Sequence, residues 1–369
     1  LPGLAALARD LVHAAIARRQ GIREILTVDS RWSACGCTII EGGERVAPAV
    51  RGRGMPCTAR HVIHAAERDE PLKRPPNEHW RISMMTRTID PVVSTEWLDD
   101  QLGSEGLVIL DIRQPESYEV AHIPGALSVP FGLLSAWADS GDLMLELPET
   151  AGLLKTIGDC GISADSRVVV VGPPPEPGVP PYALADPFRV AATLIYAGVK
   201  NAAVLTGGFA KWDSEGRATT TAVPVVTPVV YDSPVDSETW VLTQYVEERL
   251  GKVVLLDGRD PDDYFGAAVD SFADMRGHIP TARCLPIIWT WEADGTLRPL
   301  EVIGEMVVGV VGQDKEQEII CYCGAGGYAS TWWFLLTQEL GYTNVKIYDG
   351  SMEAWADEGK PIVAYTWTE

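Results

Sequence analysis

The chain has 369 residues, of which 46% are apolar and 22% are charged. This length allows two or three domains with substantial cores, and the composition excludes wholesale disorder. No apolar run approaches the roughly 20 residues that span a bilayer. The net charge of -21 disfavours nucleic acid and anionic membranes as partners, because both are bound mainly through Lys and Arg. The seven cysteines do not resemble a secreted disulfide framework, so we expect a reducing, cytoplasmic environment.

Residues 1–84 differ from the rest of the chain in charge. They hold 13 basic and 9 acidic residues, a balance of +4, whereas the remainder carries -25. Their closely spaced cysteines and histidines match no closed zinc spacing, so we expect no metal site there. Two interpretations stay open. The segment is either an extension of uncertain order or translated upstream sequence, with the functional protein starting at Met84 or Met85. The joint change of composition and charge at that point favours the second.

The remaining chain contains two similar halves. Each half offers a buried strand that ends in an aspartate, a His-Ile-Pro segment, two further strands, and a closing glycine turn with a tryptophan. The closing tryptophans, Trp212 and Trp355, are 143 residues apart. Short apolar strands that alternate with helices predict an α/β fold, a mostly parallel sheet flanked by helices in each half. We expect an N-terminal domain at 85–212, a linker at 213–234 and a C-terminal domain at 235–369.

The most informative segment is the six-residue loop 323–328, which begins at Cys323. It follows an expected buried strand, contains three glycines within four residues and precedes an apolar helix. Glycines let backbone amides turn inward, and the following helix directs its N-terminus to the same point. We therefore expect a cup of amides that lowers the pKa of Cys323 without a nearby Lys or Arg and that also holds a persulfide anion. The alternative is a buried core cysteine, which has no need of three glycines. Cys321 is expected to be an inert core thiol.

The first half has no equivalent cysteine. Its corresponding loop, residues 172–181, is rich in proline, which lacks the amide donor that an anion cup requires. Asp186 is expected to cap a helix that begins with Pro187. We expect this half to be catalytically silent and to form one wall of a cleft at the domain interface.

The order of these features, repeated twice, resembles the tandem-domain rhodanese and mercaptopyruvate sulfurtransferase family. The resemblance covers about residues 92–364. It implies two rhodanese-like domains and transfer of sulfane sulfur, with no metal or organic cofactor. The loop has the length typical of sulfurtransferases, and Ala329 stands where similarly shaped phosphatases need an arginine. Ala325 stands where the mercaptopyruvate branch has a serine. Gly324 and Ala325 stand where the thiosulfate branch usually has basic residues. The sequence therefore matches neither branch and does not decide which sulfur donor is the substrate.

The resemblance also implies roles for individual side chains. Asp111 and His122 would face the cysteine loop and assist proton transfer, although a backbone-bonded structural role for His122 is equally open. Arg259 matches the position of an arginine that binds the substrate anion, with a surface ion pair as the alternative. Arg113, Arg276 and Arg283 are weaker candidates, and His278 is expected to be structural. The rest of the substrate site would be the loop residues Gly324, Ala325, Gly326, Gly327 and Tyr328, with the Tyr328 ring at the pocket mouth.

The favoured function is therefore a double displacement. The Cys323 thiolate would take sulfur from a small anionic donor, thiosulfate or 3-mercaptopyruvate, and a thiol or cyanide acceptor would remove it. The alternative is a non-catalytic sulfur-carrier or anion-binding module, which the missing serine and missing basic loop residues favour.

Overall fold

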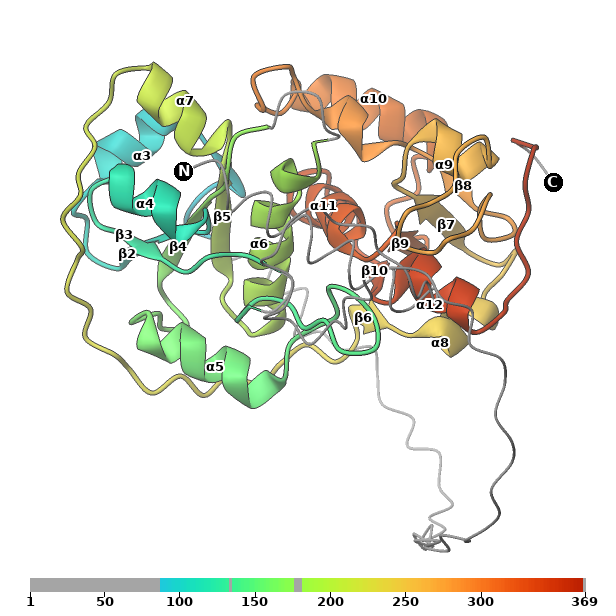
Figure 1. Ribbon diagram of the computed structural model, residues 1–369, viewed down its shortest axis with the longest axis horizontal. Coiled ribbons are helices and arrows are strands. Elements are labelled where there is room, and N and C mark those ends of the chain that lie inside the picture. Colours follow the sequence, from blue (N-terminus) through green and yellow to red (C-terminus); the bar gives the residue numbers. More distant parts are fainter. Residues whose placement is uncertain (1–86, 133–134, 176–180, 368–369) are drawn as a thin grey trace, which may run out of the picture. The chain divides into compact units, whose positions relative to one another are not determined.

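The computed structural model describes residues 87–132, 135–175 and 181–367 (Figure 1). The expectations for residues 1–84 lie outside these ranges. Among the described residues, no helix combines the length and the apolar character needed to cross a bilayer.

The first domain is built on a parallel sheet with strand order β1-β5-β4-β2-β3. Its strands are β1 (Val92–Val93), β2 (Leu107–Asp111), β3 (Ala126–Ser128), β4 (Arg167–Val171) and β5 (Asn201–Leu205). The sheet is flanked by α3 (Thr95–Gln101), α4 (Pro115–Val120), α5 (Thr150–Asp159), α6 (Asp186–Tyr196) and α7 (Gly208–Ser214), and a 3-10 turn, η2 (Tyr182–Leu184), precedes α6.

The second domain repeats this order as β6-β10-β9-β7-β8, again with parallel pairs. Its strands are β6 (Trp240–Val241), β7 (Val254–Asp257), β8 (Arg283–Cys284), β9 (Ile319–Tyr322) and β10 (Val345–Tyr348). Its helices are α8 (Thr243–Glu247), α9 (Pro261–Phe265), α10 (Leu300–Val310), α11 (Gly327–Phe334) and α12 (Ser351–Asp357), with a 3-10 turn, η3 (Ile287–Thr290), and a π-helical turn, η4 (Leu335–Glu339). The predicted fold, two parallel α/β sheets flanked by helices, is confirmed.

Alternate side chains of the strands enter different cores, because successive residues of a strand point to opposite faces. Ile109 packs with α3, α4 and α7, whereas Leu110 packs in a larger core that also contains α5 and α6. That larger core continues through α10 and α11 of the second domain. The remaining face of the second sheet is covered by α8, α9 and α12. The two domains thus share one apolar core, and α6 packs directly on α11 (Figure 1).

The start of α6 differs from the sequence prediction. Asp186 is the first helical residue, Ala185 is the N-cap, and the Asp186 side chain makes no capping hydrogen bond. The turn η2 already brings Ala185 into helical backbone geometry, so the helix begins before an aspartate cap can form. Asp186 instead lines the pocket described below.

Candidate active site

Two glycines, Gly326 and Gly324, shape the cysteine loop. Gly326 precedes α11 with a left-handed φ of 89°, which side chains other than glycine rarely adopt. At Gly324, a Cβ atom would lie 2.5 Å from the Cδ2 atom of Phe272. The loop therefore turns tightly from the end of β9 into the N-terminus of α11, as the sequence predicts.

Cys323 lies at the centre of this turn and is 3% exposed. The Gly326 amide donates a hydrogen bond to its Sγ atom at 3.0 Å. The Cys323 amide donates to the Ser351 hydroxyl at 3.1 Å, and the Met352 amide donates to the Cys323 carbonyl at 2.9 Å. The start of α12 thus fixes the backbone, while the loop amide points at the sulfur. The inward-facing amide agrees with the predicted cup.

The predicted lowering of the Cys323 pKa is wrong in sign. Burial raises the pKa of this thiol, and the backbone amides of Ala329, Ala325, Gly326 and Tyr328 oppose that rise without overcoming it. The expectation that no cationic side chain lies near is wrong as well. The buried guanidinium of Arg189 interacts electrostatically with Cys323.

Arg189 reaches the loop from α6 of the first domain. Its side chain is fully buried and forms an ion pair with Asp349 at 3.3 Å. It also donates to the Leu145 carbonyl and lies 4.3 Å from the centre of the Trp240 ring. Sequence reasoning missed this residue, because an arginine within an apolar helical segment carries no local sign of its distant partner.

A pocket that opens to solvent lies over Cys323. Four of the predicted loop residues line it together with the nucleophile: Gly324, Ala325, Gly327 and Tyr328. The first domain contributes Leu145, Tyr182, Ala185 and Asp186. The expected wall from the first domain is therefore present, whereas the sequence does not indicate its individual residues.

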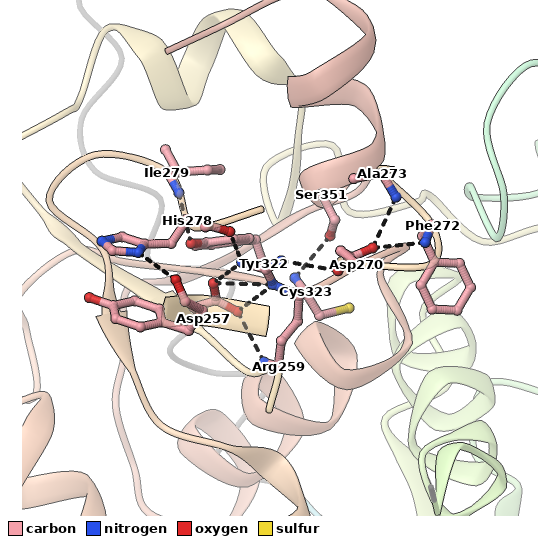
Figure 2. Close-up of polar contacts among 12 residues, drawn as sticks. Asp257, Arg259, Asp270, Phe272, Ala273, His278, Ile279, Tyr322, Cys323 and Ser351 are labelled. Carbon is pink, nitrogen blue, oxygen red and sulfur yellow. Dashed lines mark hydrogen bonds and ion pairs between the residues drawn. The ribbon is translucent and has the colours of Figure 1, made fainter. Parts of the chain in front are cut away.

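Arg259 also lines the pocket, but its guanidinium is already engaged. Nε and Nη2 donate to Asp257, with Nη2 at 2.6 Å, and Nη1 donates to Asp270 at 3.0 Å (Figure 2). The Asp270 carboxylate in turn accepts the amides of Phe272 and Ala273. Arg259 therefore holds the segment that places the Phe272 ring against Gly324. The alternative interpretation of Arg259 as part of a surface ion pair is wrong, because this arginine is only 3% exposed.

Asp111 and His122 do not line this pocket. Asp111 is fully buried and forms an ion pair with Arg113 at 2.6 Å. The His122 ring lies between the carbonyls of Tyr118 and Ala222, at 2.9 and 3.1 Å, and stacks on the Tyr118 ring at 3.7 Å. These contacts are those of the structural alternative for His122.

The second domain contains a copy of the same arrangement. Asp257 pairs with Arg259 as Asp111 pairs with Arg113, and His278 stacks on the Tyr264 ring at 3.7 Å. Two domains with different loops therefore share these buried contacts. Arg276 and Arg283 donate to nearby backbone carbonyls and, like Arg113, lie outside the pocket lining.

Cys321 lies on β9 and is completely buried. It packs in the same core as Cys323, as the two-residue spacing on a strand predicts. Burial raises the pKa of its thiol, and both cysteines are free.

Two copies of one family pattern cover most of this architecture. The family model described as "Rhodanese-like domain" matches residues 94–215 and 242–358. The chain belongs to the rhodanese family. Each match includes four of the five strands of one sheet, and the second includes the Cys323 loop. The rhodanese fold of the chain is therefore duplicated, with the cysteine loop in the second copy.

Several curated relatives span nearly the whole pair of rhodanese domains. The chain is 30% identical over 285 residues to "Sulfur carrier protein TtuD" of Thermus thermophilus, covering 73% of this chain and 95% of that protein. It is 32% identical over 290 residues to "Putative thiosulfate sulfurtransferase SseA" of Mycobacterium leprae, covering 74% and 90%. A solved structure of EanB in complex with ergothioneine has a TM-score of 0.65 and 23% identity, covering 75% of this chain and 70% of that one. That structure shares the fold.

Proposed function

We propose that this rhodanese transfers sulfane sulfur through a persulfide on Cys323. The observation that carries the proposal is the Gly326 amide, which donates to the Cys323 sulfur at 3.0 Å at the base of an open pocket. A sulfur donor can reach the nucleophile only through an accessible pocket. The negative charge on the sulfur must also be stabilised by fixed hydrogen-bond donors, which the loop amides provide. The names of the curated relatives support sulfur transfer as the general chemistry.

The first step is attack of the Cys323 thiolate on the outer sulfur of thiosulfate. A new sulfur–sulfur bond forms on Cys323, and the sulfur–sulfur bond of thiosulfate breaks with its electron pair leaving on sulfite. With 3-mercaptopyruvate, the carbon–sulfur bond breaks instead, and the pyruvate enolate takes up a proton. In the second step a thiolate or cyanide attacks the outer persulfide sulfur and returns the Cys323 thiolate.

The loop residues hold the charge during both steps, and the Arg189 guanidinium adds an electrostatic contribution from the first domain. Arg259 acts as a positioning residue through Asp270 and Phe272. Asp111 and His122 maintain the first domain.

The test is mass spectrometry of the intact chain after treatment with thiosulfate. Cys323 should gain one sulfur atom, Cys323→Ser should gain none, and Cys321→Ala, which alters the other buried thiol of the same strand region, should gain sulfur as the unmodified protein does. Sulfur on another cysteine, with Cys323 unmodified, would refute the proposal.

A sulfur-carrier role is the second candidate, because the raised pKa of Cys323 makes the resting thiol a weak nucleophile and one relative is named a sulfur carrier. Thiocyanate formation from thiosulfate and cyanide, run beside pyruvate release from 3-mercaptopyruvate, separates the two roles. Steady turnover in either assay indicates the enzyme. One equivalent of persulfide without turnover indicates the carrier.

A further inference from the structure

The pocket over Cys323 is acidic. Four aspartates line it, namely Asp186, Asp260, Asp263 and Asp270, and Arg259 is the basic residue among the described lining residues. The charge of Arg259 is already matched twice, by Asp257 at 2.6 Å and by Asp270 at 3.0 Å. Its presence therefore leaves the negative potential of the pocket in place.

Three of the aspartates form no ion pair within the described part of the chain, and the charge of Arg259 acts on Asp263 only from a longer distance. None of the ion pairs found there involves Asp186, Asp260 or Asp263, and the Oδ1 atom of Asp260 is buried without a hydrogen-bond partner. Burial, followed by repulsion from Asp270, raises the pKa of Asp263 to about 6. Burial also raises the pKa values of Asp260 and Asp186. Each carboxylate would be stabilised by a positive charge in the pocket.

Aromatic rings form the other part of the wall. Tyr182 stacks with Tyr328 at a centroid distance of 5.6 Å, and Phe272 meets Tyr182 edge-on at 6.2 Å. Tyr328 is 7% exposed, yet its buried hydroxyl has no hydrogen-bond partner. An unused hydroxyl in a pocket wall is a site for a ligand's polar hydrogen, and the faces of tyrosine rings attract organic cations.

We infer that the sulfur acceptor of this pocket is a small organic cation, a thiol compound that carries an ammonium group. This inference rests on the proposed persulfide chemistry and names the acceptor class. Carboxylates and aromatic faces together suit an ammonium group, which each of them attracts. A metal ion is the less suitable occupant, since the described residues contain no group of three or more His, Cys, Asp or Glu side chains arranged to hold one.

The transfer of sulfur from the Cys323 persulfide to the acceptor thiol requires no further reactant. The acceptor thiol loses its proton to solvent, and its thiolate attacks the outer sulfur of the Cys323 persulfide. The new sulfur–sulfur bond forms on the acceptor, while the old bond breaks with its electron pair on Cys323. The ammonium group, held by the carboxylates, lies beside the thiolate that leaves and stabilises it. The persulfide is itself anionic, so loading the enzyme strengthens the attraction for a cation.

The test compares three small thiols as acceptors after Cys323 has been loaded from thiosulfate and the load verified by mass. The thiols are cysteamine, 2-mercaptoethanol and 3-mercaptopropionate, which carry a positive, a neutral and a negative group. Rates of persulfide loss are measured at pH 8, above the pKa of Asp263, and are divided by the thiolate concentration. We expect the cation to react at least about tenfold faster than the anion, the factor that roughly 1.4 kcal/mol produces.

The variants Asp263→Asn and Asp260→Asn should each reduce that cation-to-anion ratio severalfold. Asp262→Asn is the matched control, because Asp262 is exposed in the same helix and does not line the pocket. It should change the ratio much less than the two pocket variants do, since Asp262 acts on Asp260 only through its charge. Equal rates for the three thiols, or the same loss in the Asp262 variant, would overturn the inference while leaving the persulfide proposal intact.

A binding measurement keeps the inference independent of turnover. Tetramethylammonium chloride should slow the alkylation of Cys323 by neutral iodoacetamide, whereas sodium chloride at the same concentration should not. The protection should weaken in Asp263→Asn. If thiosulfate never loads Cys323, the proposed function fails by the mass measurement alone; absence of protection by the ammonium ion refutes the cation site.

Discussion

Replacing Arg189 with methionine should destabilise the protein strongly, because the guanidinium is the buried partner of Asp349. Arg189 is fully buried and Asp349 is 6% exposed. Both terminal nitrogens of the guanidinium lie 3.3 Å from the Oδ1 atom of Asp349. Methionine would fill much of the volume. Among the described residues it would leave the aspartate with the Leu147 amide, which donates to its Oδ2 atom at 2.9 Å.

The expected loss is about 3–5 kcal/mol in the free energy of unfolding, the range for removing one partner of a buried ion pair. Equilibrium urea denaturation, followed by tryptophan fluorescence and by circular dichroism, measures it. The double variant Arg189→Met with Asp349→Asn should recover part of the loss, since the orphaned carboxylate is then gone. A coupling energy of roughly 1–3 kcal/mol is expected from this cycle.

Lys155→Met is the matched control for loss of a cation. Lys155 and Asp159 form an i,i+4 ion pair on α5, with side chains 74% and 55% exposed. Exposed helical pairs contribute about 0.3–0.5 kcal/mol, so this variant should be nearly neutral. If Arg189→Met lowered the free energy of unfolding by less than about 1 kcal/mol, the ion pair with Asp349 would contribute no more than an exposed pair does. That result would contradict its role as a buried, stabilising ion pair.

Three further outcomes are expected. Burial raises the pKa of the Cys323 thiol. Its thiolate fraction should therefore rise by about tenfold per pH unit from pH 6 to 8, and the rate of alkylation by iodoacetamide should rise with it. A plateau of that rate below pH 8 would contradict the raised pKa. Gly324→Ala would place a Cβ atom 2.5 Å from the Phe272 ring. It should lower the free energy of unfolding by roughly 1–3 kcal/mol and slow persulfide formation on Cys323. Unchanged thermal unfolding and an unchanged rate of persulfide formation would contradict this contact. His122→Gln and its counterpart His278→Gln should both lower the unfolding free energy without changing the loading rate of the folded fraction, as measured by mass; slower loading in the His122 variant alone would restore its proton-transfer role.

The parts of the fold set by local sequence were predictable. The buried strand that the sequence predicts before the Cys323 loop is β9, at Ile319–Tyr322. Runs of apolar residues between turns are sufficient for such assignments, because strand burial is visible in the sequence. The Cys323 loop was predictable for the same reason, since three glycines before a helix restrict the backbone to few shapes.

The electrostatics of the site were not predictable, because they depend on contacts between distant segments. The sign of the Cys323 pKa shift is set by burial, which in turn depends on how α6 of the first domain packs on α11. The pocket carboxylate of Asp186 was assigned to a helix cap, since an aspartate before a proline is a common cap. The position of Asp260, Asp263 and Asp270 around one pocket depends on the tertiary structure.

The first domain provides four residues of the pocket wall, namely Leu145, Tyr182, Ala185 and Asp186. Substitutions at these places can change which compounds reach the sulfur and need not alter a single peptide group around it. With the function proposed above, changes in the first copy of the fold would alter chemical preference, while the turn around Cys323 in the second copy would keep its geometry.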